Sequence, residues 1–293
     1  MASYAQDVKN ELAHKFDDDD ECLRAEFVAL INVGAKIVDG RLEFASFNAA
    51  VARKVITLGK KFFPNVKPEV AAVRRKRLLK NLCYVVRFVA ADEVQIFFDA
   101  LDVNDLLRRT RYRVAYVRGA FLAGGSVNRP ETEYSLQIVT RSAAKSCFIH
   151  EQLIQLEFNA GFYQRKKEFV VWLREADSVC DFLGMLGAVN AVERFEVARN
   201  LKEIRAQVNR VVNMETASLN RAIAAAQRQL NDIRALLARK IPVNDVLREA
   251  MKLRVKNPTA TVGELAAKVP ITREGMQYRF AVIHRLAKKY TKK

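Results

Sequence analysis

YVRGAFLAGGSV, at residues 116–127, is the stretch of the sequence that decides the fold. Its small and apolar residues predict a helix that ends at Gly124 and Gly125 and is followed by a short strand. Gly119 lies inside that helix, where a glycine costs about 0.5–1 kcal/mol relative to alanine. We expect the helix to recover this cost by packing closely against another backbone.

A partner helix of the right kind lies earlier in the chain. RAEFVALINVGAKI (24–37) resembles VAYVRGAFLAGGSV (114–127) after a shift of 90 positions. Each segment places small residues four apart, and therefore on one helix face. The matching residues are Ala25, Ala29, Val33 and Gly34 in the first segment and Ala115, Gly119, Ala123 and Gly124 in the second. The repeat predicts two αββα halves whose first helices pack about a pseudo-twofold axis.

Strands and further helices are expected after each of these helices. β-branched and aromatic residues predict strands within 36–47, around an Asp39–Gly40 turn, and within 81–90, 134–141 and 162–175. Helical patterns occupy 49–63, 143–158 and 177–187. No Gly or Pro occurs between Gly187 and Pro242, which predicts one or two long helices. Residues 243–290 are predicted to form three or four further helices. The fold class is therefore α+β, with an all-α C-terminal part.

The charge of the chain is concentrated towards its end. The formal net charge is +17, and residues 196–293 contribute 21 basic and 8 acidic residues, a net of +13. A basic region of this kind favours polyanions because each neutralised phosphate releases condensed counterions, so double-stranded DNA is the first candidate partner. The longest apolar stretches are far shorter than a membrane span, and the N-terminus lacks the apolar core of a signal peptide. We therefore expect a cytoplasmic, nucleoid-associated protein without a membrane partner.

Nothing in the sequence indicates a metal site or a cofactor. The cysteines and histidines are scattered rather than clustered as zinc ligands are, and the cysteines read as ordinary buried thiols. These residues are Cys22, Cys83, Cys147, Cys180, His14, His150 and His284. DDDD (17–20) lacks the spacing of a calcium loop, and we interpret it as an exposed loop that places carboxylates at the start of a helix.

The repeated helices, each followed by a hairpin, resemble those of the LAGLIDADG homing endonucleases. In that family an acidic residue at the end of each helix binds the catalytic metal. The equivalent positions in this sequence are Gly34 and Gly124. The resemblance therefore implies a homing-endonuclease scaffold without its metal ligands, which would not be an enzyme.

A more specific resemblance spans the whole chain. MASYAQDVKNEL at the start, YVRGAFLAGGSVNRPET in the middle, NRVVNMETASLNRAIAAAQRQLNDI (209–233) and a C-terminal helix-turn-helix resemble the WhiA family. The resemblance implies a degenerate LAGLIDADG domain at 1–190, with repeats at about 21–100 and 112–190. A helical connector at 191–240 and a helix-turn-helix domain at 241–293 follow. It also implies a bacterial regulator of transcription linked to cell division and sporulation.

The connector motif of that family is carried by Asn209, Arg210, Asn213, Asn220 and Arg221. We interpret these side chains as a polar network that holds the connector against a domain, with contact to DNA as the alternative. A second regulatory protein is a further candidate partner of the chain, for the LAGLIDADG-like domain.

The helix-turn-helix is predicted within TVGELAAKVPITREGMQYRFAVIHRLAKKY (261–290). Thr261 with Glu264 forms a capping box, the first helix runs to about Lys268, and Thr272 caps the second helix. Met276, Phe280, Ile283 and Ala287 share one face, which should be buried. Residues near the start of such a helix contact base edges, and basic residues further along suit phosphates. The candidate DNA-binding residues are Thr272, Arg273, Glu274, Gln277, Tyr278, Arg279, Arg285 and Lys288.

Two rival functions fit parts of the sequence. A metal-dependent DNA endonuclease would need other carboxylates, such as Glu131 or Glu133, just past the second repeat helix. An RNA-binding protein of the maturase type is the other rival. The basic runs RRKR (74–77), in a predicted loop, and RRTRYR (108–113), just before the second repeat helix, could contact phosphate or simply be solvated.

Overall fold

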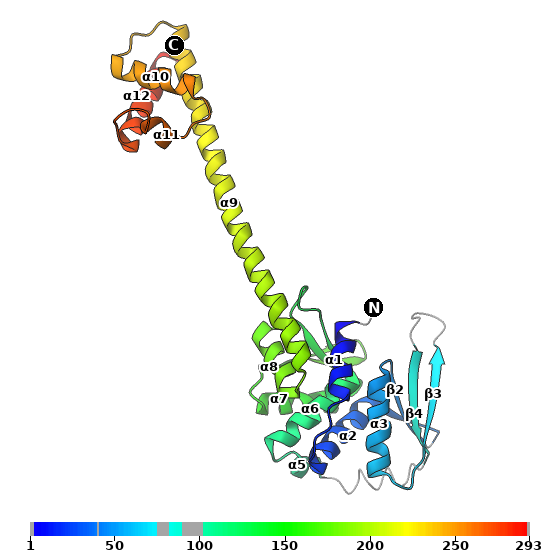
Figure 1. Ribbon diagram of the computed structural model, residues 1–293. Coiled ribbons are helices and arrows are strands. Elements are labelled where there is room, and N and C mark those ends of the chain that lie inside the picture. The colour runs from blue at the N-terminus through cyan, green and yellow to red at the C-terminus, as the bar shows by residue number, and fades with distance from the viewer. Residues whose placement is uncertain (1–2, 40, 75–81, 90–101, 292–293) are drawn as a thin grey trace. The chain divides into compact units, whose positions relative to one another are not determined.

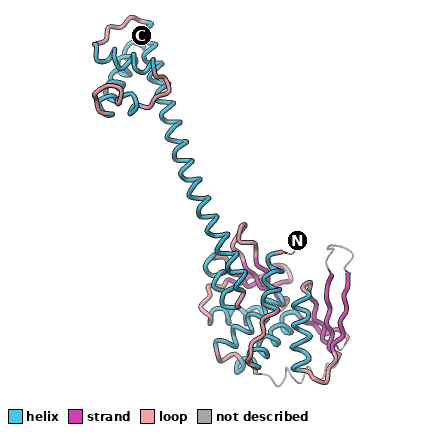
Figure 2. The backbone as a smooth tube through the Cα atoms, viewed as in Figure 1, coloured by secondary structure: helices cyan, strands magenta, loops and turns pink. Residues whose placement is uncertain are grey.

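The structure is a computed structural model that describes residues 3–39, 41–74, 82–89 and 102–291. The chain divides into two compact units, residues 1–202 and 203–293 (Figure 1). The first unit contains helices and two sheets, and the described part of the second contains helices (Figure 2). The predicted α+β class is therefore confirmed.

The first unit contains two halves with the same order of elements. The first half consists of α2 (Asp20–Gly34), β1 (Ala35–Val38), β2 (Arg41–Ser46), α3 (Ala49–Phe62), β3 (Pro68–Arg74) and β4 (Leu82–Phe88). The second consists of α6 (Thr110–Gly124), β5 (Gly125–Val127), β6 (Leu136–Thr140), α7 (Ala143–Gln155), β7 (Gly161–Arg165) and β8 (Glu168–Leu173). The short helices α1 (Tyr4–Ala13), α5 (Val103–Leu106) and α8 (Ala176–Leu186) accompany them.

Each half carries a four-stranded antiparallel sheet, in the orders β1-β2-β4-β3 and β5-β6-β8-β7. The half is therefore αββαββ, which extends the expected αββα unit by a second hairpin. Side chains alternate across the strands, so that Leu136, Ile138 and Thr140 of β6 are buried whereas Gln137 and Val139 are only partly buried. Each sheet thus turns one face towards the helices.

Close packing of α2 against α6 explains why a glycine occupies position 119 inside a helix (Figure 1). A Cβ atom on Gly119 would lie 2.2 Å from the carbonyl oxygen of Glu26 and 2.9 Å from the Cβ of Ala29. A Cβ on Gly34 would lie 3.2 Å from the Cβ of Ala123, and one on Gly124 would lie 3.0 Å from Cγ1 of Val33. The small residues predicted from the repeat therefore do meet across the pseudo-twofold axis.

The start of α2 agrees with the interpretation of the aspartate run. Asp19 is the N-cap, and its carboxylate accepts a hydrogen bond of 2.9 Å from the Glu21 N–H. Asp17, however, does more than occupy a loop, because it pairs with Arg118 of α6.

Several smaller expectations need correction or lie outside the described residues. RRTRYR does not precede the second repeat helix, because α6 begins at Thr110 within it. Cys22 and Cys83 are buried as expected, but Cys147 is exposed on α7. Gly40 and residues 75–77 of the RRKR run lie outside the described residues.

The long segment without Gly or Pro forms one helix, α9 (Val189–Ala238). Ala191 and Phe195, near its start, are part of the hydrophobic core of the first unit. Ile233 and Leu236, near its end, are part of the core of the second unit. Each core therefore takes residues from α9 itself, and the predicted domain limits at 190 and 241 stay a prediction.

Candidate nucleic-acid interface

The second unit is a small helical domain with α10 (Asp245–Lys256), α11 (Val262–Ala266) and α12 (Arg273–Thr291). The predicted capping box at α11 is present. The hydroxyl of Thr261 accepts a hydrogen bond of 3.2 Å from the Glu264 N–H, and the Glu264 carboxylate accepts one of 2.7 Å from the Thr261 N–H. The helix ends at Ala266 rather than near Lys268, and a turn through residues 267–270 leads to the second helix.

The second helix of the motif is oriented by its cap and its apolar face. The hydroxyl of Thr272 accepts a hydrogen bond of 3.1 Å from the Gly275 N–H at the start of α12. The four residues predicted to share the inner face are buried, at exposures of 0–4%. They are Met276, Phe280, Ile283 and Ala287, and they pack in one cluster with Leu247, Met251 and Leu265. This packing fixes which face of α12 is turned to solvent.

Arg254 is a buried cation in this domain that sequence reasoning missed. It is 1% exposed, and its Nε donates a hydrogen bond of 2.9 Å to the Gln229 side chain of α9. Its guanidinium also donates to the carbonyls of Asn257 and Ala260 and lies 5.4 Å from the ring centre of Phe280. Burial lowers the pKa of the Arg254 guanidinium. One side chain thus ties α10, the following loop and α12 together.

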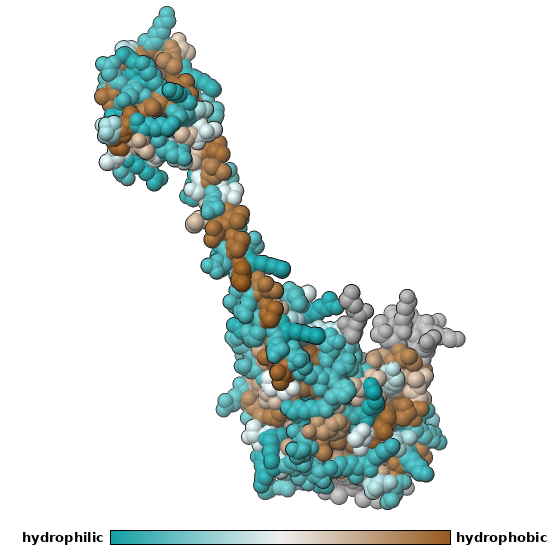
Figure 3. Space-filling model, in the orientation of Figure 1, coloured by the Kyte–Doolittle hydropathy of each residue, from teal (hydrophilic) through white to brown (hydrophobic). Residues whose placement is uncertain are grey.

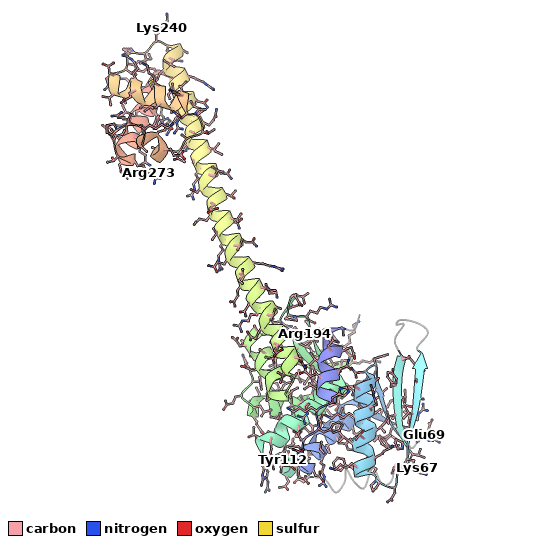
Figure 4. All side chains as sticks on the ribbon, viewed as in Figure 1. Lys67, Glu69, Tyr112, Arg194, Lys240 and Arg273 are labelled. Carbon is pink, nitrogen blue, oxygen red and sulfur yellow. The ribbon has the colours of Figure 1, made fainter. Side chains whose placement is uncertain are left out.

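Most of the candidate DNA-binding residues lie on the solvent side of α12. Seven of them are exposed: Thr272, Arg273, Glu274, Gln277, Tyr278, Arg285 and Lys288. Arg273 lies at the outside of the helical unit (Figure 4). Arg279 differs, because its guanidinium forms a 3.0 Å ion pair with Glu249 of α10 and its side chain is only 18% exposed. The exposed set could contact both base edges and phosphates.

The side chains of the connector motif are exposed on α9. Asn209, Arg210, Asn213, Asn220 and Arg221 are all exposed, and the Arg221 side chain donates to the Ala217 carbonyl of the same helix. The structure therefore does not bear out the polar network that we expected to hold the connector. At 100° per residue, the three asparagines lie on one face of α9, and Ile204, Val208 and Leu219, which are also exposed, lie on a different face. Hydrophobic residues accordingly line the surface of α9 (Figure 3).

Gly34 and Gly124, which the sequence matches to the metal-ligand positions of LAGLIDADG endonucleases, are the last residues of α2 and α6. Both are too crowded for a side chain. A Cβ on Gly124 would lie 2.4 Å from the Val139 carbonyl oxygen, and one on Gly34 would lie 2.3 Å from the ring of Phe44. Glu131 and Glu133 are exposed in the loop between β5 and β6. Within the described ranges, no three His, Cys, Asp or Glu side chains are grouped so that they could hold a metal ion.

A second buried polar cluster, also missed from the sequence, lies beside the paired helices. Glu26 of α2 is fully buried and pairs with Lys54 of α3 at 2.6 Å and with Arg118 of α6 at 3.0 Å. Arg118 also pairs with Asp17, and Lys54 donates to the carbonyls of Leu12 and Lys15. Burial lowers the pKa of Lys54, and the Glu26 carboxylate opposes that shift. The cluster joins α2, α3 and α6, and the side chains of Glu26, Lys54 and Arg118 are closed to solvent, so we assign it to stability.

These features define a protein with a LAGLIDADG-like domain followed by a helix-turn-helix domain. Family models match the chain in three places: the WhiA N-terminal LAGLIDADG-like domain at 20–109, the WhiA LAGLIDADG-like domain at 113–205 and the WhiA C-terminal HTH domain at 208–287. The chain therefore belongs to the WhiA family, as its motifs predicted.

Individual relatives agree with this assignment. "Probable cell division protein WhiA" of Staphylococcus carnosus (strain TM300) is 35% identical over an alignment of 307 residues, which covers 98% of this chain and 97% of the relative. A protein of the same name from Desulforamulus reducens is 37% identical over 311 residues, covering 98% and 96%.

Solved structures show the same fold. "Crystal structure of full-length DUF199/WhiA from Thermatoga maritima" matches with a TM-score of 0.64 at 19% identity and covers 98% of this chain and 99% of that one. "Crystal structure of the N-terminal LAGLIDADG domain of DUF199/WhiA" matches with a TM-score of 0.55 at 17% identity and covers 64% of this chain and 91% of that one. Among the described residues, no helix is both long and apolar enough to cross a membrane.

Proposed function

We propose that this protein is a sequence-specific regulator of transcription that binds double-stranded DNA through α12, acts in cell division and sporulation, and does not cleave DNA. The observation that carries the proposal is the exposed set of polar and basic residues on α12, fixed in place by a capped turn and a buried inner face. The link to cell division rests on the names of the relatives, and the link to sporulation rests on the family resemblance.

Within this proposal, Arg273 and Gln277 read bases. Both are exposed near the start of α12, one turn apart. An arginine can pair with guanine O6 and N7, and a glutamine with adenine N6 and N7, each contact being worth about 1–3 kcal/mol of discrimination. Thr272, Glu274 and Tyr278 flank them, and Arg285 and Lys288 neutralise phosphates. The surplus of basic residues after position 196 supports this assignment.

The absence of nuclease activity is supported by the ends of α2 and α6. A carboxylate at the Gly124 position would drive its Cβ into the backbone of β6, at the Val139 carbonyl. The scaffold is therefore closed around these positions, where a metal-dependent nuclease needs room for two carboxylates, a metal ion and a phosphate. We assign the LAGLIDADG-like domain to contacts with the DNA backbone or with a second regulatory protein.

The test uses fragmented genomic DNA from the source organism, incubated with the full-length protein and Mg²⁺. Retained fragments are sequenced and also run on a denaturing gel. We expect a small number of enriched, intact sites, with the protein associated with the nucleoid in cells. New strand ends at the enriched sites would instead support the nuclease, and tighter binding of structured RNA than of duplex DNA at equal salt would support the maturase-type function.

Arg273→Ala and Gln277→Ala test the assignment of the base-reading residues. Each substitution should lower the preference for the enriched site over random duplex by roughly 5- to 150-fold, which corresponds to about 1–3 kcal/mol. Circular dichroism and the melting temperature should be unchanged, because both side chains are exposed. Unchanged site preference in both variants would remove these residues from the interface.

A further inference from the structure

The first helix of the C-terminal domain, α10, carries a row of basic residues that the proposed function leaves unused. Arg248, Lys252 and Lys256 follow one another at intervals of four residues, and all three are exposed. Successive members are displaced by about 6 Å along the helix and turned by about 40° around it. They therefore form a continuous row on the solvent face, opposite the buried Ala250.

The acidic residues beside this row are already engaged within the domain. Asp245 pairs with Arg248 at 2.6 Å, and Glu249 pairs with Arg279 of α12 at 3.0 Å. No ion pair of Lys252 or Lys256 occurs in the described part of the chain. The face consequently has a surplus of positive charge, which an anionic partner could neutralise.

The row is connected to the helix that we propose to read bases. The Glu249–Arg279 ion pair bridges the outer side of α10 and α12, and Tyr278 and Arg285 are exposed on that same helix. Residues of α10, including the row and Leu253, also line an open hollow in the surface. A strand of nucleic acid that follows the exposed side of α12 could therefore continue along α10.

We propose that this face of α10 binds the sugar-phosphate backbone of duplex DNA through Arg248, Lys252 and Lys256. The proposal rests on the proposed function, because it places the DNA on the C-terminal domain. Three cations about 6 Å apart span about 12 Å, which matches several phosphates at a rise of about 3.4 Å per nucleotide along one strand. Contacts of this kind set position and affinity but carry no base specificity.

The experiment measures the salt dependence of binding to a random-sequence 30-base-pair duplex by fluorescence anisotropy, with the full-length protein. Lys252→Gln combined with Lys256→Gln should reduce the slope of log K against log salt by about 1.8, since each phosphate contact contributes about 0.9. Binding should weaken most at low salt, and the curves of variant and wild type should converge at high salt. Preference for the enriched genomic site should not change.

A matched control removes two charges elsewhere in the same domain. Arg239→Gln with Lys240→Gln, just after α9, lowers the net charge equally and should leave the slope unchanged. An unchanged slope in the Lys252/Lys256 variant, or an equal loss in the control, would overturn the proposal.

The melting temperature separates a binding role from a structural one. Lys256 lies in the last turn of α10, where a cation favours the helix dipole. A lower melting temperature with an unchanged slope would show that this is its only role. Failure of the wild-type protein to bind any duplex would instead refute the proposed function itself.

Discussion

At the scale of single residues, the first unit is held by buried charges that its sequence does not reveal. Glu26 pairs with Lys54 in the first half. Tyr116 occupies the equivalent position of α6, after the shift of 90 residues, and its ring packs against Phe148 at a centroid distance of 5.3 Å. The equivalent positions of α2 and α6 thus hold a buried carboxylate in one half and a buried aromatic ring in the other. An ion pair in a buried site is costly to break, because the remaining charge stays desolvated.

Replacing Lys54 tests this cost. Lys54→Met should lower the free energy of unfolding by about 3–5 kcal/mol, because it leaves the buried Glu26 with one cation fewer. Lys61→Met is the matched control on the same helix, since Lys61 forms an exposed ion pair with Asp20 and should cost at most about 1 kcal/mol. Urea denaturation provides the measurement, and equal losses in both variants would contradict the role given to the buried cluster.

The buried side chain of Lys9 should make the free energy of unfolding depend on pH. Burial lowers the pKa of this side chain on α1 to about 8 from 10.5. Above pH 8 the folded protein loses a proton that the unfolded chain keeps until about pH 10.5, so stability should rise with pH. Below pH 8 the side chain is charged in both states, and the contribution to the slope disappears.

The measurement is urea denaturation at several pH values for the wild type and Lys9→Met. At pH 7 the Lys9→Met variant should have the larger free energy of unfolding. The gap between the variant and the wild type should narrow by about 2 kcal/mol between pH 8 and 9.5, because the wild type becomes more stable. Parallel curves for the two proteins would show that Lys9 does not titrate in this range.

At the scale of elements, close helix packing takes precedence over helix propensity. Gly119 is unfavourable in an isolated helix, yet a side chain there would meet the backbone of α2 at Glu26. The capped turn between α11 and α12 shows the opposite relation, because Thr261, Glu264 and Thr272 act within a few residues and need no tertiary partner. Capping residues within a few positions therefore fix where a helix begins or ends. Contacts between two helices decide at which positions a small residue is required.

Gly119→Ala is expected to destabilise the first unit, although alanine is the better helix former. The added Cβ would lie 2.2 Å from a carbonyl oxygen, and overpacking of this kind typically costs about 1–3 kcal/mol. Gly184→Ala in α8 is the control, because its Cβ would meet only Val192, at an ordinary 3.9 Å. That substitution should be neutral or stabilising by up to about 1 kcal/mol. Thermal melts compare the two, and a stabilised Gly119→Ala would contradict the packing argument.

At the scale of the whole molecule, two separate hydrophobic cores are present along one chain. The first contains residues from α1 to the start of α9, and the second contains the end of α9 with α10, α11 and α12. The net charge follows the same division, because most of the basic surplus comes after residue 196. Two separately packed units with different net charges therefore lie along the chain.

The two cores should unfold in separate transitions. Arg254→Ala should lower only the transition of the second unit, by an amount equivalent to about 1–3 kcal/mol, because it leaves part-buried acceptors unpaired. Lys54→Met should lower only the other transition. Differential scanning calorimetry of the two variants measures this, and a single transition that both substitutions shift would show that the units unfold together.

The sequence by itself determined the repeat, the paired helices, the order of most strands, the uninterrupted α9 and the capped turn of the helix-turn-helix. These features depend on local propensity and periodicity, which a short window of residues contains. The resemblance of the two repeat helices also led to the prediction, which stays a prediction, that Gly34 and Gly124 occupy the positions of metal-binding carboxylates. The candidate DNA-binding residues of α12 could be selected in the same way, because helical spacing separates the buried Met276 and Phe280 from their exposed neighbours.

Only the tertiary structure decided which charges are buried and which are free. Glu26, Lys54 and Arg118 are far apart in the chain, and their pairing depends on how three helices pack. The pairing of Arg279 with Glu249, the anchoring of Arg254 and the exposure of the asparagines on α9 likewise follow from contacts between elements. The sequence does not show whether a charged residue faces water or a buried partner. The two environments differ in desolvation, and desolvation arises only when distant segments of the chain pack together.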